Sequence, residues 1–128
     1  MIGITLNRAE IEYAVMLAVL NFETEFMKSH YTRATVHIHD TLIEVTLKAA
    51  ASIPAEDRLA ESPQGRALLQ HSHADLFHSG QHLLKQRLER DLGLNIDQLF
   101  SHLDAVAGTN TVIIKLNESI DHRRDRER

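Results

Sequence analysis

The chain has 128 residues, 43% of them hydrophobic, with no cysteine and a formal net charge of −4. This length and composition predict one domain with a packed core, and the missing cysteines exclude disulfides, thiolate metal sites and cysteine nucleophiles. The slightly acidic balance and the 5% aromatic content argue against a nucleic-acid binder. The N-terminus lacks the regions of a signal peptide, and the most apolar run, residues 13–20, is shorter than the roughly 20 residues that span a bilayer. We therefore expect a cytoplasmic protein without direct membrane insertion.

The first predicted element is a helix from residue 7 to about residue 28. Asn7 and Glu10 have the spacing of a capping box, and apolar residues recur along one face at Ile11, Val15, Ala18, Phe22 and Phe26. The middle of the helix is also apolar on its other sides, at Met16, Leu17, Val19 and Leu20. A helix that is apolar on two sides usually packs against two partners. The second partner is either a thick core or another subunit, and we expect a homodimer.

Alternating β-branched and polar residues predict a hairpin over residues 34–48, with its tight turn at Asp40-Thr41. Pro54 then begins a short helix to about Glu61. Ser62-Pro63 starts a second, longer helix, in which the serine is the cap and the proline takes the first position.

The long helix has an apolar pattern that runs from residue 67 to residue 92 and ends before Gly93. One of its sides holds Leu69, Leu76, Gly80 and Leu83, and beside them lie Phe77, Leu84, Leu88 and Leu92. Gly65, in its first turn, indicates close packing or a backbone approach. Two more strands are predicted, over residues 98–104 and 111–116.

The predicted order of elements is α-β-β-α-α-β-β, an α+β fold. The economical arrangement is a two-layer sandwich, in which a four-stranded, mainly antiparallel sheet carries the helices on one face. Residues 1–117 form the single domain, and the charged residues 118–128 are expected to be a flexible tail.

Three stretches together resemble the MpsC-like family, which is named for a Na+-translocating membrane-potential-generating system. They are NFETEFM at 21–27, IPAEDRLAESPQGR at 53–66, and HLD followed by TVIIKL near the C-terminus. The family pattern matches Glu23, Glu25, Met27, Asp40, Pro54, Glu56, Gly65, Arg66 and Asp104. The chain departs from it at Lys28-Ser29-His30-Tyr31, where the family has glycine-arginine-glycine-proline, and at Ile53, where the family has threonine. The resemblance implies a non-catalytic accessory or sensing role in membrane ion or inorganic-carbon uptake, with a membrane-transport partner.

The sharpest local motif is the histidine-rich run at residues 71–82. Helical geometry brings four of its potential ligands within about 60° of each other: His71, Asp75, His78 and His82. His78 and His82 have the spacing with which two imidazoles hold one Zn or Ni ion. The alternatives are a metal-binding protein or zinc-dependent enzyme, and a solvated helix face that is rich in histidine. His73 falls on the apolar side and is expected to be packed and hydrogen-bonded.

A second candidate lies on the sheet. His37 and His39 alternate onto one face, and His102 and Asp104 could join them if the second hairpin pairs beside the first. Such a cluster could bind zinc or transfer protons. The alternative is the solvent-facing side of a one-sided sheet, with Asp104 simply ending its strand.

A third candidate is the start of the long helix at Gly65-Arg66. A cation in a first helical turn opposes the helix dipole, so Arg66 is expected to have a specific partner. That partner is a carboxylate, Glu56 or Glu23, or a small anion such as bicarbonate or phosphate. The sequence contains no P-loop, dinucleotide fingerprint or nucleophile elbow, so we expect a binding protein in preference to an enzyme.

Overall fold

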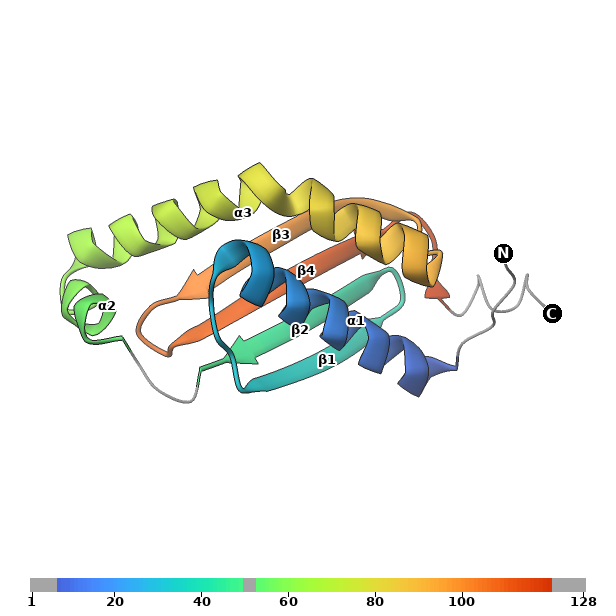
Figure 1. The fold of residues 1–128 in the computed structure, drawn as a ribbon, viewed down its shortest axis with the longest axis horizontal. Helices are drawn as coiled ribbons and strands as arrows, with labels where there is room; N and C mark the ends of the chain where they lie inside the picture. The colour runs from blue at the N-terminus through green and yellow to red at the C-terminus, as the bar shows by residue number, and fades with distance from the viewer. Residues whose placement is uncertain (1–6, 50–52, 121–128) are drawn as a thin grey trace.

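The computed structural model describes residues 7–49 and 53–120, and it confirms the predicted α+β fold. Figure 1 shows a sheet with the helices on one face. The elements follow the predicted order, except that the first helix ends in a separate π-helical turn. They are α1 (Arg8–Phe22), η1 (Glu23–Met27), β1 (Arg33–His39), β2 (Leu42–Lys48), α2 (Pro54–Leu59), α3 (Pro63–Leu92), β3 (Ile96–Asp104) and β4 (Thr109–Leu116).

The four strands pair antiparallel in the order β1-β2-β4-β3. The two hairpins therefore meet through β2 and β4, and β1 and β3 are the two edges. In this register Leu47 of β2 lies opposite Asn110 of β4, which in turn lies opposite Leu103 of β3. Asn110 thus occupies a position on the helix-facing side of the sheet, in line with the buried Val112 and Ile114.

The helices begin and end as their sequences predict. Asn7 and Glu10 form the capping box of α1. The Ser62 hydroxyl accepts a hydrogen bond from the Gly65 N–H at the start of α3, and Gly93 ends α3 with a φ of 65°. Among residues 7–49 and 53–120, no helix has the length and apolar character needed to cross a membrane. Of the predicted tail, residues 121–128 lie outside the described part of the chain, and Ile120 is buried in the core.

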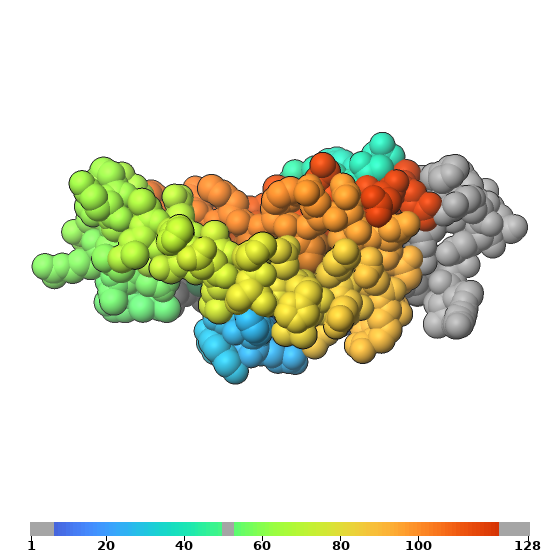
Figure 2. Space-filling view, turned by 90° about the horizontal axis from the view of Figure 1, so that it is seen from above, coloured from blue at the N-terminus to red at the C-terminus, as the bar shows by residue number. Residues whose placement is uncertain are grey.

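The buried side of α3 comprises most, but not all, of the predicted apolar pattern. Its core residues are Phe77, Gly80, Leu84, Leu88 and Leu92, whereas Leu76 and Leu83 are 41% and 44% exposed. Gly80 explains the orientation, because a Cβ atom there would lie 2.2 Å from the ring of Phe26. The helix turns Gly80 toward η1, and of the predicted leucine side only Leu76 and Leu83 face outward, while Leu69 lines a cleft. In Figure 2, α3 runs along the molecule between β3 and the end of the first helix.

Candidate functional site

Two polar residues lie inside the hydrophobic core of the described chain. Glu23, the first residue of η1, and Asn110 of β4 both have 0% exposure. The Asn110 Nδ2 atom donates to Glu23 Oε1 over a long 3.5 Å. The other carboxyl oxygen, Oε2, is buried and has no hydrogen-bond partner among the described residues. A buried polar atom without a partner typically costs about 1–3 kcal/mol, so a carboxyl at this position needs an explanation beyond packing.

A chain of side chains connects this carboxyl with α3. Ser101 Oγ donates to Asn110 Oδ1 over 2.9 Å, and His73 Nε2 lies 2.8 Å from the same Ser101 oxygen. Because Ser101 has one hydroxyl hydrogen and gives it to Asn110, His73 must be the donor in its own contact. Every hydrogen in the chain therefore points toward Glu23, an orientation that favours negative charge there. His73 is packed and hydrogen-bonded, as its position on the helix predicts.

Burial sets the protonation of these groups. Desolvation raises the pKa of Glu23 to about 7, against the opposing effect of the Asn110 hydrogen bond. Desolvation also lowers the pKa of His73, which its side-chain contact with Asn110 raises and the nearby His102 lowers. The pKa of Tyr31 rises to about 12, first through burial and then through the negative charge of Glu23. Near neutral pH, Glu23 is thus the group of this cluster whose charge changes.

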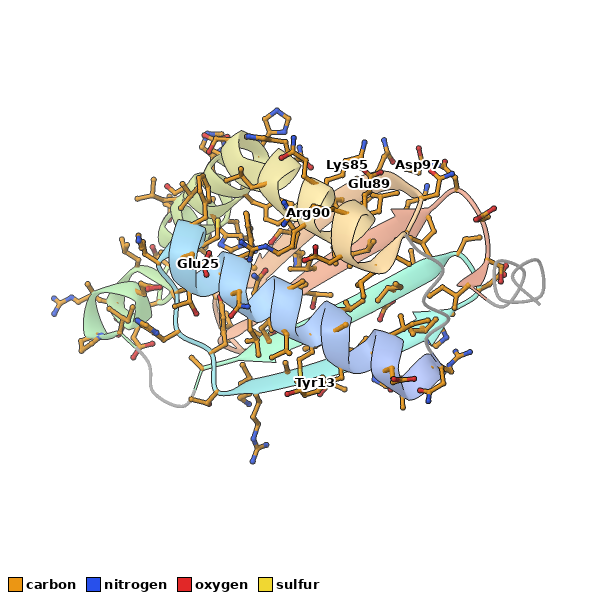
Figure 3. The ribbon with its side chains drawn as sticks, turned by 45° about the vertical axis from the view of Figure 1, so that its right-hand side comes forward. Tyr13, Glu25, Lys85, Glu89, Arg90 and Asp97 are labelled. Carbon is orange, nitrogen blue, oxygen red and sulfur yellow. The ribbon has the colours of Figure 1, made fainter. Side chains whose placement is uncertain are left out.

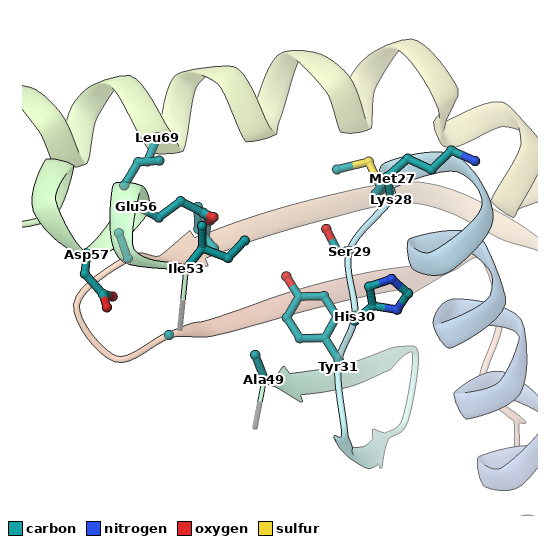
Figure 4. Close-up of a pocket in the computed structure, with 13 residues that line it drawn as sticks. Met27, Lys28, Ser29, His30, Tyr31, Ala49, Ile53, Glu56, Asp57 and Leu69 are labelled. Atoms are coloured by element: carbon teal, nitrogen blue, oxygen red, sulfur yellow. The ribbon is translucent and has the colours of Figure 1, made fainter. Parts of the chain in front are cut away.

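A cleft of about 460 Å³ opens beside the cluster. Figure 4 shows Ser29 and Tyr31, from the segment after η1, on one side and Ile53, Glu56 and Leu69 on the other. Its complete lining is Met27, Lys28, Ser29, His30, Tyr31, Ala49, Ile53, Glu56, Asp57, Leu69, Leu103, Ala105 and Gly108. Met27 lies four residues after Glu23 in η1, and Tyr31 responds to the Glu23 charge. Tyr31 therefore connects the cleft with the buried carboxyl.

The turn that positions these groups is a π-helix. The five residues of η1 are followed by Lys28 in the left-handed region, with a φ of 60°, and the Ser29 N–H donates to the Glu23 carbonyl. π-Helical turns are rare, and those found within α-helices occur frequently at functional sites. The turn places the Glu23 side chain in the core and leads the following segment along the cleft.

The structure does not form the predicted pair between Arg66 and a carboxylate. The Arg66 Nη1 atom donates to the main-chain carbonyl of Ala60 over 2.8 Å. The N–H groups of Gly65 and Arg66 bond to the Ser62 hydroxyl and carbonyl. A Cβ at Gly65 would lie 1.7 Å from the Leu59 carbonyl oxygen, which confirms the predicted backbone approach. This corner is a closed structural junction between α2 and α3, and anion binding there stays a prediction.

The histidines of α3 lie on an exposed face, as the helical pattern predicts. His71 Nε2 is 3.1 Å from the Asp75 carboxylate, and His78 Nδ1 is 3.0 Å from the Gln81 amide, while His82 is exposed. In the described part of the chain, no three or more histidine or acidic side chains are grouped so that they could hold a metal ion. Binding of Zn or Ni by this face stays a prediction.

The predicted joint site on the sheet is not formed. His37 and His39 lie on the edge strand β1, with ring centroids 6.1 Å apart, whereas His102 and Asp104 lie on β3 at the opposite edge. Three strand spacings, roughly 14 Å, separate the two edges. Asp104 ends its strand, since its Oδ1 atom accepts from the N–H groups of Val106 and Ala107.

Sequence reasoning named Glu23 as a candidate but missed Asn110, Ser101 and Tyr31. The sequence pattern nevertheless contains a signal that Glu23 and Asn110 are buried. Glu23 follows Val19 and precedes Met27 by four residues, on a side of the helix that is otherwise apolar. Asn110 continues the inward alternation of β4. A polar residue at a position that the pattern assigns to the core indicates a buried contact.

The family described as "Na+-translocating membrane potential-generating system (MpsC)" matches residues 7–118. This range includes η1, the cleft and the chain of side chains that leads to His73. No curated protein and no solved structure matches the chain. Since the family match covers most of the 128 residues, the chain belongs to the MpsC family.

Proposed function

We propose that this protein is a non-catalytic accessory or sensing component of a Na+-linked membrane-potential system, working in the cytoplasm. The family description supports the link to such a system. The observation that carries the sensing role is the buried Glu23 carboxyl, with its unpartnered oxygen, next to an open cleft. A group that titrates near neutral pH and lies beside a binding cleft can translate occupancy of the cleft into a change of charge inside the fold.

The contact between Ser101 and His73 has the residue types of a nucleophile and its base, but its geometry argues against catalysis. Ser101 gives its hydrogen to Asn110 and accepts one from His73, which is the reverse of what an activated serine requires. Neither residue lines the cleft. Their contact supports the position of Asn110, and through it the position of Glu23.

We also propose that the protein acts as a homodimer through the outer side of its helices. Tyr13 and Leu17 of α1 are 60% and 39% exposed, and Leu83 of α3 is 44% exposed (Figure 3 labels Tyr13). A small groove between α1, η1 and α3 is lined by Phe22, Glu25, Phe26, Leu83 and Arg87. Exposed apolar residues next to a groove are typical of protein interfaces. A membrane-transport protein is the other partner that this surface would fit.

The accessory role is tested by deleting the gene in the native cell and measuring the Na+-dependent membrane potential with a voltage-sensitive dye. We expect the potential to fall on deletion and to return with the wild-type gene. The Glu61→Gln variant, which changes an exposed carboxylate outside the cleft, should restore it equally well, whereas Glu23→Gln should restore it only partly. A deletion strain with an unchanged Na+-dependent potential would contradict the proposal.

A further inference from the structure

We propose that the cleft beside η1 is a binding site for a small amphipathic amine, an organic cation with an apolar body. In this assignment the ammonium group pairs with the Glu56 carboxylate and the Tyr31 hydroxyl, and the apolar body lies deeper between η1 and α3. The inference rests on the proposed sensing role, because it names the class of molecule that the cleft would sense.

The charges around the cleft favour a cation. Figure 4 shows the Glu56 side chain reaching from α2 into the cleft, while Lys28 points away from it. Behind Tyr31 lies the second carboxyl, Glu23. The negative charges of Glu23 and Glu56 both raise the pKa of Tyr31, so the potential at its hydroxyl is negative when these carboxyls are ionised. An ammonium group placed there gains attraction from two carboxylates at once.

The remaining surface of the cleft favours an apolar body. Six of the lining residues have apolar side chains. They are Met27 of η1, Ala49 and Ile53 before α2, Leu69 of α3, and Leu103 and Ala105 at the end of β3. A volume of about 460 Å³ fits within the roughly 300–1,000 Å³ of ordinary small-molecule sites. A purely polar ion would leave most of this surface in contact with water.

An anion is the less suitable occupant. The N–H groups at the nearby start of α3 are bonded to Ser62, and the Arg66 guanidinium is bonded to Ala60. Lys28, which lines the cleft, points outward (Figure 4). A carboxylate ligand would therefore meet Glu56 without a cation to balance it.

Binding of the amine is expected to release protons. A positive charge near a carboxyl favours its ionised form, so the occupied cleft should lower the proton affinity of Glu23. The other titratable groups of the cleft and of the buried cluster are Lys28, His30, Tyr31, Glu56, Asp57 and His73, with His102 of β3 close to His73. Of these, Glu56 contacts the ligand directly in the proposed arrangement.

The site is tested with three probes of matched size: n-butylammonium, n-butanol and butyrate. In amide-detected NMR titrations of the full chain at neutral pH, we expect butylammonium to cause saturable shifts at Ser29, Tyr31 and Glu56. Butanol should bind about tenfold or more weakly, and butyrate should cause no saturable shift there. Saturable shifts with butyrate, or none with butylammonium, would overturn the assignment.

Two variants locate the contacts. Glu56→Gln, on the exposed surface of the short helix α2, should weaken butylammonium binding about tenfold, whereas Glu61→Gln should leave it unchanged. Calorimetry in buffers with different ionisation enthalpies should show proton release from the wild type that disappears in Glu23→Gln. Binding that is equally strong in Glu56→Gln would contradict the proposal. Failure of these experiments alongside a clear membrane-potential defect in the deletion strain would reject the amine site and leave the accessory role standing.

Discussion

Glu23 is the residue on which the account depends. Its pKa in the folded protein is about 7, above the ordinary 4.5, so the folded state binds its proton more tightly than the unfolded chain does. The resulting contribution to stability is complete below about pH 4.5 and is lost as the pH rises through 7. At 1.36 kcal/mol for each pKa unit, the loss is on the order of 3 kcal/mol. The protein is thus expected to become less stable on passing from mildly acidic to mildly alkaline solution.

The Glu23→Gln variant should remove most of this pH dependence, because its amide keeps the shape of the side chain without a titrating proton. Urea unfolding at a series of pH values from about 5 to 8 measures the free energy of unfolding of both proteins. We expect the wild type to lose up to about 3 kcal/mol more than the variant over this range. Parallel curves for the two proteins would mean that Glu23 does not titrate near neutral pH.

At the scale of the elements, the close contact between α3 and η1 fixes the cluster in place. Gly80 allows the Phe26 ring to lie against the α3 backbone, and Phe26 stacks on Phe22 with 5.4 Å between ring centroids. Phe77 meets Phe22 edge-on at 5.8 Å. These contacts hold η1 against α3 and thereby determine where Glu23 enters the core.

The Gly80→Ala substitution tests this contact through the sign of its effect. In an isolated helix, alanine would stabilise by about 1 kcal/mol relative to glycine. Here the new methyl group would overlap the Phe26 ring, so we expect a net destabilisation of about 1–3 kcal/mol in chemical unfolding. The double variant with Phe26→Ala should lose less than the sum of the two single variants. A Gly80→Ala protein more stable than the wild type would contradict the packing.

Arg66 at the corner between α2 and α3 gives a second test at this scale. Arg66→Ala removes the hydrogen bond to the Ala60 carbonyl and should lower the melting temperature. A net loss of about 1–2 kcal/mol is expected, because the donor is charged and the contact is half-buried. Bicarbonate and phosphate should shift the wild type and the variant equally. Stabilisation by either anion in the wild type alone would support an anion site at Gly65-Arg66.

The order and type of the elements could be predicted because they follow from local patterns. Caps at Asn7 and Ser62, and alternation along the strands, specify helices and strands without reference to distant residues. The rotation of α3 about its axis could not be predicted, because Leu76 and Leu83 fit a helical face as well as Phe77 and Leu84 do. Only the approach of Phe26, more than fifty residues away in the chain, decides between these faces.

The candidate site, too, could be predicted from the sequence only in part. Glu23 was named from the sequence, but its partner Asn110 lies 87 positions away, and no local pattern connects the two. The histidine run on α3, the most conspicuous motif, lies outside the cleft. The sheet order places the remaining predicted pair, His37 with His102, on opposite edges because the hairpins meet through β2 and β4.

At the scale of the whole molecule, the helical layer has an inner side on the sheet and an outer side with exposed apolar residues. Leu17 is central to the outer side of α1 and contributes little to the core, so Leu17→Glu should fold normally. Light scattering at high micromolar concentration should show a dimer for the wild type and a monomer for this variant, since burying a new carboxylate in the interface is unfavourable. Ala55→Glu, on the exposed surface of α2, is the matched control and should remain a dimer. A wild type that is monomeric under these conditions would contradict the dimer.

The buried carboxyl, the cleft and their coupling are tested together by one measurement, a carbon-detected NMR titration of the Glu23 side-chain carboxyl with and without n-butylammonium. We predict a titration midpoint at about pH 7 in the free protein, which moves to lower pH when the amine is present. A midpoint near the ordinary 4.5 in the free protein, or a midpoint near 7 that does not change with the amine, would contradict the account.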